Sequence, residues 1–136
     1  MIQHIIAAAD ELDPSQTIVV IGKDTPSIAA AIDPIATVVQ SPAQGTGHAV
    51  QVAMSELDGF EDDVLVLCGD VPMITVETLQ RMVALRASAD SPSVVVLGFR
   101  PDDAAAYGRL VLGEGGDLEC IVEAKDASPA ELDINF

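Results

Sequence analysis

Apolar positions along the chain follow two alternating patterns, one typical of helices and the other of buried strands. Isoleucine and alanine recur every three or four residues in residues 1–12, which predicts an amphipathic helix with no capping residue before it. Residues 17–21 form a continuous β-branched run bounded by Pro14 and Gly22, which is typical of a buried strand. The patterns then alternate, predicting strands at residues 35–39, 64–67 and 93–97 and threonine-capped helices at residues 25–32, 46–57 and 75–87.

The alternation of strand-like and helix-like patterns ends toward the C-terminus. Strand-like runs at residues 108–112 and 118–122 flank residues 113–116, a glycine-rich sequence typical of a hairpin turn, and Ser128 opens a last short helix. Alternating strands and helices with short connections predict a mostly parallel sheet with helices on both faces. We therefore expect an α/β fold that ends in an antiparallel hairpin. No linker or repeat indicates an internal domain boundary.

The composition is that of a globular domain, with 49% hydrophobic and 21% charged residues among 136. Aromatic residues are only 3%, so the core is expected to be aliphatic. The formal net charge of −16, from 22 acidic and 6 basic residues, argues against binding to nucleic acid or an anionic membrane, because both need a basic surface. A nucleotide remains compatible with this charge, since a bound Mg²⁺ can dominate the local field.

Several kinds of chemistry and location have no support in the sequence. No stretch has the length and apolarity of a membrane span, and no signal-peptide pattern opens the chain. Cys68 and Cys120 lack metal or disulfide spacing, so we expect reduced thiols in a cytoplasmic protein. His4 and His48 are too isolated for a metal cluster, and we interpret His48 as a packing residue or one that acts through a neighbour.

Gln40 and the turn Gly45-Thr46-Gly47 form the first candidate site, at the end of an expected strand. A side-chain amide carries a donor and an acceptor, so it can pair with the edge of a uracil or thymine ring. Glycine lets the backbone approach a planar base, and the helix start beyond it offers free amides. The alternative for so short a motif is an ordinary strand–turn–helix connection capped by Thr46.

A second candidate site is Cys68-Gly69-Asp70, which follows the apolar run of residues 64–67. Ligands bind outside the carboxyl ends of strands in open α/β sheets, where Asp70 would lie. Mg²⁺ is held by one or two carboxylates together with phosphate oxygens and water, and Gly69 leaves room for a sugar or phosphate. The alternative is that Asp70 is a turn residue before Pro72.

Two weaker candidates lie in the last third of the chain. Gly108, between Tyr107 and Arg109, could present a backbone amide to a sugar, and Glu123 could accept from sugar hydroxyls. The alternatives are a glycine at a strand entry and an exposed carboxylate. Lys125 and Asp126 are interpreted as a solvated pair.

Taken together, these motifs resemble the uridylyltransferase domain of the bacterial bifunctional N-acetylglucosamine-1-phosphate uridyltransferase/glucosamine-1-phosphate acetyltransferase family. Their order and spacing along nearly the whole chain carry the resemblance. The matching segments are residues 1–5, Gln40 with residues 45–49, residues 69–72, 76–81, 107–109 and 121–126, and Ile134-Asn135.

The resemblance implies a three-layer, Rossmann-like nucleotidyltransferase fold and a set of binding residues. Three residues would contact the uracil: Gln40, Gly45 and Thr46. Three would line the ribose and the phosphates: Cys68, Gly69 and Asp70. Three would hold the amino sugar: Gly108, Glu123 and Asn135. Asp70 would also bind the cofactor Mg²⁺ and is the one catalytic residue that the resemblance implies.

The chain also departs from the family pattern. In the family, a strand, a Leu-Ala-Ala-Gly-x-Gly-Thr-Arg-Met phosphate loop and a Pro-Lys pair come before the point that matches Met1. A second Mg²⁺ ligand, an asparagine, and a trimerising left-handed β-helix follow the point that matches Phe136. The family often has tyrosine where this chain has Cys68. We therefore expect residues 1–136 to be a partial nucleotidyltransferase domain that lacks a central strand and, alone, is catalytically silent and marginally stable.

The resemblance implies transfer of a uridylyl group from UTP to N-acetylglucosamine 1-phosphate, giving UDP-N-acetylglucosamine and pyrophosphate without a covalent intermediate. This product is a precursor of peptidoglycan and lipopolysaccharide, made in the cytoplasm. Two alternatives stay open: a related sugar-phosphate or cofactor nucleotidyltransferase, and a non-catalytic nucleotide-binding fragment. Small molecules are the expected partners in each case.

Overall fold

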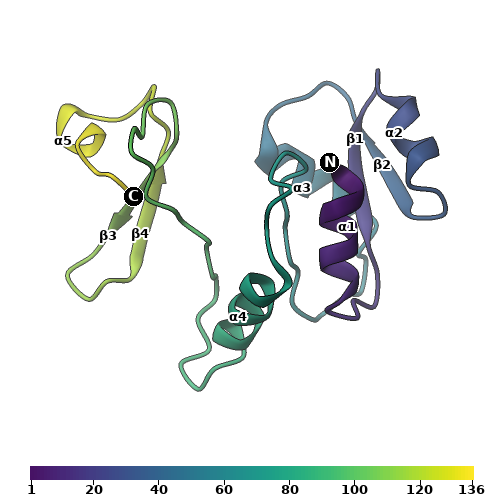
Figure 1. Ribbon diagram of the computed structural model, residues 1–136, viewed down its shortest axis with the longest axis horizontal. Helices are drawn as coiled ribbons and strands as arrows, with labels where there is room; N and C mark the ends of the chain where they lie inside the picture. The colour runs from purple at the N-terminus through teal and green to yellow at the C-terminus, as the bar shows by residue number, and fades with distance from the viewer. The chain divides into compact units, whose positions relative to one another are not determined.

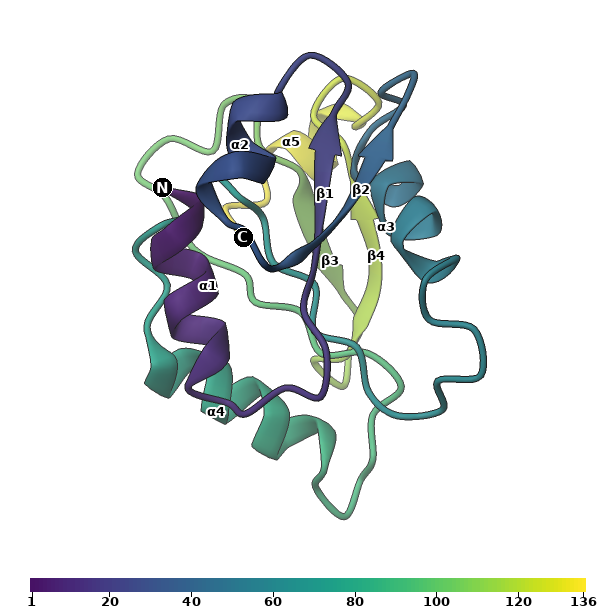
Figure 2. The same cartoon turned by 90° about the vertical axis from the view of Figure 1, so that its right-hand side faces the viewer.

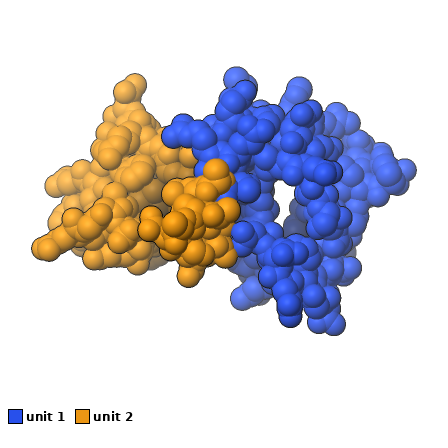
Figure 3. Space-filling view, turned by 90° about the horizontal axis from the view of Figure 1, so that it is seen from below, with its two compact units in different colours: residues 1–83 blue, residues 84–136 orange.

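Nine regular elements run along residues 1–136, all of which the computed structural model describes (Figure 1). They belong to two compact units, residues 1–83 and residues 84–136, coloured blue and orange in Figure 3. The helices have at most eleven residues. None of them is long and apolar enough to cross a membrane.

A parallel pair of strands, β1 (Ile18–Gly22) and β2 (Ala36–Gln40), is the centre of the first unit. The two strands run in the same direction (Figure 2), and every residue of one is opposite a residue of the other. Parallel strands need a crossover connection, and α2 (Pro26–Ala31) supplies it. Helix α3 (Thr46–Met54) packs against both strands. The predicted α/β character of this part of the chain is confirmed.

The core of the first unit is aliphatic, as the scarcity of aromatic residues predicts. Val19 and Ile21 are two residues apart in β1, so their side chains lie on the same face. They form a buried cluster with Ile6, on the apolar face of α1 (Ile2–Asp10), and with Ile32, at the end of α2. The helix expected over residues 1–12 is thus confirmed, and Met1 at its N-cap provides no side-chain hydrogen bond.

Helix α4 (Val76–Arg86) begins as its sequence predicts. The hydroxyl of Thr75 accepts a hydrogen bond from the backbone N–H of Thr78 at 3.3 Å, which caps the helix. In the first turn, the backbone amide of Glu77 and the hydroxyl of Thr75 hold the pKa of the Glu77 carboxyl below its usual value. Leu79 is completely buried.

The second unit contains the expected antiparallel hairpin, formed by β3 (Arg109–Leu112) and β4 (Leu118–Val122). Gly116 in the turn has a φ of +85°, a conformation that glycine adopts without strain. The backbone N–H of Leu110 donates to the carbonyl oxygen of Phe136 at 2.7 Å. The last residue is therefore held against the first strand of the hairpin.

Helix α5 (Pro129–Leu132) begins with a reciprocal capping box. The Ser128 hydroxyl accepts from the backbone N–H of Glu131 at 3.3 Å, and the backbone N–H of Ser128 donates to Glu131 Oε2 at 2.7 Å. These hydrogen bonds from the side chain and the backbone of Ser128 lower the pKa of Glu131. The helix predicted to start at Ser128 is confirmed.

Acidification is expected to loosen this capping box. Because the folded pKa of Glu131 lies below its unfolded value, the carboxylate stabilises the helix start above the unfolded pKa, and this contribution is lost as the pH falls through the folded pKa. Hydrogen exchange at the Ser128 amide, corrected for the intrinsic rate, should rise over that range in the wild type. Glu131→Ala, which removes the acceptor, should exchange fast at every pH, and Glu114→Ala should behave as the wild type. A protected amide in Glu131→Ala would contradict this role.

Two predicted strands do not form. Residues 64–67 and 93–97 are extended but pair with no other strand, and most of their apolar side chains are exposed. The sequence contains the right residues for buried strands, but an extended segment becomes a strand only with a hydrogen-bonding neighbour. The result is two separate two-stranded sheets, which fits the incomplete sheet that the family resemblance implies.

The predicted cap of α3 is wrong, whereas Thr25 is the N-cap of α2 as predicted but makes no capping hydrogen bond. Gly45, with a φ of +87°, is the N-cap of α3, and Thr46 is its first helical residue. Thr25 occupies the N-cap position of α2, but its hydroxyl donates to the carbonyl of Gly22 at 2.8 Å. Neither threonine therefore accepts from an amide of its helix.

Candidate functional site

The structure brings Gln40, Gly45 and His48 together where β2 leads into α3. Gln40 Nε2 donates to the carbonyl oxygen of Gly45 at 2.9 Å and lies 3.0 Å from His48 Nδ1. Gln40 and His48 are half-buried. The sequence interpretation of His48 as a residue acting through a neighbour agrees with this contact.

The turn before α3 leaves its backbone open. Apart from adjacent residues and the backbone of α3 itself, no heavy atom lies within 4 Å of the Cβ position at Gly45 or at Gly47. Because α3 has no side-chain cap, the N–H groups of its first turn have no side-chain acceptor. The strand end, the two glycines and Thr46 thus present a side-chain amide beside backbone donors. This arrangement can receive a planar ring or an anionic group.

Cys68, Gly69 and Asp70 lie in an exposed turn, in which the N–H of Val71 donates to the carbonyl of Cys68 at 3.3 Å. The Cβ position of Gly69 is 3.7 Å from Ile2 Cδ1, so a larger side chain would press against α1. No hydrogen bond joins this turn to Gln40 or Gly45. The predicted strand before Asp70 has no partner, so the carboxylate is not fixed by a sheet edge.

The donor set at Asp70 bears on whether Mg²⁺ could be held there. No group of three His, Cys, Asp or Glu residues in the chain is arranged to hold a metal ion. A single exposed carboxylate is nevertheless what Mg²⁺ uses when substrate phosphates and water supply its other ligands. Asp70 therefore fits an ion that arrives with a nucleotide, and it does not form a metal site from protein groups alone.

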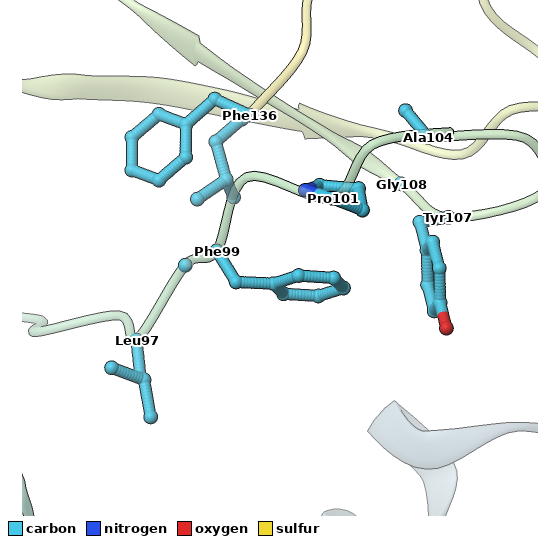
Figure 4. Close-up of a pocket in the computed structure, with 9 residues that line it drawn as sticks. Leu97, Phe99, Pro101, Ala104, Tyr107, Gly108 and Phe136 are labelled. Atoms are coloured by element: carbon cyan, nitrogen blue, oxygen red, sulfur yellow. The ribbon is translucent and has the colours of Figure 1, made fainter.

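In the second unit, Gly108 lines a small apolar hollow of about 100 Å³ together with aromatic residues (Figure 4). Phe99 and Tyr107 meet edge to face with ring centroids 5.0 Å apart, and Phe136 lies on another side. A Cβ at Gly108 would be 3.5 Å from the carbonyl oxygen of Val122.

Arg109 is the residue whose role the sequence did not reveal. The residue is 3% exposed, and its guanidinium donates to backbone carbonyls on two segments. Nη1 bonds Ala104 at 3.2 Å and also Tyr107, while Nε bonds Leu132 at 3.4 Å. Nη2 bonds Ala105 at 3.4 Å. Arg109 therefore ties the loop that precedes Gly108 to the end of α5.

The remaining predicted sugar-binding residues are exposed. Glu123 follows β4 in a turn closed by a hydrogen bond from the N–H of Asp126 to its carbonyl at 2.9 Å. Asn135 lies between the two chain segments held by Arg109 and by Leu110. Gly108 and Asn135 thus both lie next to backbone that Arg109 and Leu110 hold by hydrogen bonds. The Glu123 side chain makes no hydrogen bond within the chain.

Comparison with known proteins identifies the class of this chain. Residues 1–117 match the family described as the MobA-like NTP transferase domain, so the chain belongs to this family. The α/β elements with a parallel strand pair and a late hairpin are compatible with a nucleotidyltransferase fold. The expected fold class is confirmed.

Three curated relatives share the name "Bifunctional protein GlmU". The protein from Rhodospirillum rubrum is 51% identical over 136 residues, which are 100% of this chain and 30% of that protein. The one from Ruegeria sp. is 49% identical over 100% of this chain and 30% of its own length. The Paramagnetospirillum magneticum protein is 46% identical over 95% of this chain and 28% of its own length.

These relatives confirm the family resemblance drawn from the motifs. The chain spans about 30% of the length of the curated relatives that it matches. By family, it is a nucleotidyltransferase.

Proposed function

We propose that this chain contributes the base-binding and sugar-binding walls of an enzyme that transfers a uridylyl group from UTP to N-acetylglucosamine 1-phosphate. The observation that carries the proposal is the Gln40 amide beside the open glycine turn at the start of α3. The similarity to proteins named bifunctional protein GlmU supports the choice of uridine and an amino sugar.

The reaction needs no protein nucleophile. An oxygen of the sugar phosphate attacks the α-phosphorus of UTP in line, the bond from that phosphorus to the bridging oxygen breaks, and pyrophosphate leaves. Such a transfer is accelerated by positioning the reactants and by neutralising the charge on the phosphates. In this chain, Gln40, Gly45 and Thr46 would orient the uracil, and Cys68 and Gly69 would border the ribose and phosphates.

Asp70 would hold Mg²⁺ together with the nucleotide phosphates. The ion, when bound, supplies positive charge that offsets charge on the transferring phosphoryl group. Gly108, Glu123 and Asn135 would hold the amino sugar, with Arg109 keeping the backbone around Gly108 in place. The product would serve cell-wall precursor synthesis in the cytoplasm, and assembly into trimers would depend on segments outside residues 1–136.

A second candidate is a non-catalytic nucleotide-binding chain. The observation that favours it is that Asp70 belongs to no group of three His, Cys, Asp or Glu residues that could hold a metal ion. A panel of nucleoside triphosphates, each tested with Mg²⁺ for protection against thermal unfolding, distinguishes the base. The proposal requires UTP to protect most. Equal protection by ATP, GTP, CTP and UTP, or stronger protection by a triphosphate other than UTP, would contradict the assignment to uridine.

Replacing Gln40 with alanine is expected to weaken the binding of uridine nucleotides and to leave the affinity for sugar phosphate nearly unchanged. The variant removes a hydrogen-bonding group from the base and from His48, which costs on the order of 1–3 kcal/mol. Calorimetric titration with UTP and with N-acetylglucosamine 1-phosphate measures both affinities. Equal losses for the two ligands would place Gln40 in the fold rather than at the base.

Replacing Asp70 with asparagine is expected to lower turnover about tenfold or more, because ~1.4 kcal/mol less transition-state stabilisation gives that factor. The substitution is made in a protein where residues 1–136 replace the aligned segment of the Rhodospirillum rubrum relative. Uridine binding should change far less than turnover. Asp62→Asn, at an exposed residue that precedes the turn, is the matched charge control. Near wild-type turnover of Asp70→Asn at ordinary Mg²⁺ would contradict its role.

A further inference from the structure

The amide nitrogen of Gln40 lies between two acceptors supplied by one helix start. Gln40 Nε2 is 2.9 Å from Gly45 O and 3.0 Å from His48 Nδ1. Gly45 is the N-cap of α3, and His48 lies in its first turn. No hydrogen bond within the chain uses Gln40 Oε1.

Elementary hydrogen-bond chemistry fixes the orientation of this amide. A carbonyl oxygen can only accept, so the nitrogen of the Gln40 amide, and not its oxygen, must face Gly45. The same nitrogen faces His48 Nδ1, which must therefore present its lone pair while the ring carries its proton on Nε2. Turning the amide by half a revolution would direct Oε1 at the Gly45 carbonyl oxygen, leaving two acceptors with no proton between them and losing that hydrogen bond.

We infer that His48 is a positioning residue which, with Gly45, holds the Gln40 amide so that only its acceptor oxygen remains for a base. This inference rests on the proposed function, in which Gln40 contacts the uracil. It also refines the sequence interpretation, because both N–H bonds of the amide are already engaged within the chain.

A fixed acceptor distinguishes the two pyrimidine bases. Uracil presents an N3–H donor, which pairs with Gln40 Oε1. Cytosine seated in the same way presents the N3 lone pair, and two acceptors then oppose each other without a proton between them. A freely turning amide could offer its nitrogen to cytosine instead. Selection against cytosine therefore depends on the two contacts that hold the amide, which is discrimination by an unfavourable contact with the wrong ligand.

Titration of the 136-residue chain with UMP and with CMP, followed by NMR, tests this role. His48→Leu removes the acceptor and keeps an apolar side chain, while His48→Asn keeps an oxygen that can accept in place of Nδ1. His4→Leu, at the other histidine of the chain, is the control. In His48→Leu, the preference for UMP over CMP should fall about threefold to tenfold, the effect of one hydrogen bond. His48→Asn and His4→Leu should keep the wild-type preference.

The outcomes separate this role from the proposed function. In a folded His48→Leu variant, the ratio of UMP affinity to CMP affinity could stay at the wild-type value, whether both affinities fall equally or neither changes. That result would overturn the role of His48 and leave the proposed function standing. A wild-type chain that favours neither UMP nor CMP would overturn both. The ¹⁵N shifts of the His48 ring give a second test that needs no variant. They should place the proton on Nε2, and a proton on Nδ1 would overturn the inference.

Discussion

Replacing Arg109 with methionine is expected to destabilise residues 84–136 by about 2–4 kcal/mol. The buried guanidinium is the donor to carbonyls on two separate segments, near Gly108 and at the end of α5. Methionine fills similar space but leaves these carbonyls without donors. Lysine should rescue little, because its donors radiate from one atom and cannot reach carbonyls that a planar guanidinium spans.

The chain has a built-in probe for this measurement. Tyr107 is the single tyrosine, and the sequence has no tryptophan, so intrinsic fluorescence during urea unfolding reports on the second unit. Arg100→Met is the matched control: Arg100 is exposed and stacks on the Phe136 ring at 4.6 Å, a contact worth about 0.5–1 kcal/mol. Equal shifts of the unfolding midpoint for Arg100→Met and Arg109→Met would contradict the role of Arg109 as the framework of this unit.

The 136-residue chain is expected to self-associate on its own, and to do so more strongly as salt is raised. The extended segments 64–67 and 93–97 expose apolar side chains and backbone groups without a strand partner, a combination that favours edge-to-edge pairing. The net charge of −16 opposes association at low ionic strength, and salt screens this repulsion within a Debye length of about 10 Å at 0.1 M.

Sedimentation velocity over a range of protein and salt concentrations measures this association. Val64→Lys places a charge on an extended segment and should shift the chain toward monomer. Val83→Lys is the matched control, because Val83 is 47% exposed on α4 and Val64 is 48% exposed. A chain that stays monomeric at every concentration and salt level would show that the extended segments do not pair with each other. An equal effect of the two lysines would assign association to apolar exposure in general.

The hydrophobic pattern predicted those elements whose partners are near in the sequence. The two strands of the first unit are joined by one short helix, and the hairpin strands by a five-residue turn, so local pattern and pairing agree. Residues 64–67 and 93–97 have the same β-branched character, but a strand depends on a neighbour that no local pattern contains. Composition indicates which segments can be extended, and pairing decides which become strands.

The candidate site divides in the same way. Gln40 and Gly45 are five residues apart, so the strand–turn–helix motif was sufficient to predict that they meet. His48 was recognised only as a residue near that site, since the contact of its Nδ1 depends on how α3 begins. The role of Arg109 was missed because its partners are main-chain carbonyls, and every residue type has one, so the sequence does not show which of them Arg109 binds. The only sequence signal was a lone arginine at the start of an apolar strand.

The most direct test of the proposed function is an assay of pyrophosphate release from UTP and N-acetylglucosamine 1-phosphate. The protein assayed is the Rhodospirillum rubrum relative in which residues 1–136 of this chain replace the aligned 30%. The unaltered relative and the isolated chain are measured in parallel. We expect the hybrid to release pyrophosphate only when both substrates are present, and the isolated chain to remain at background. An active relative beside a hybrid that melts at the same temperature but stays at background would contradict the assignment of this chain to uridylyl transfer.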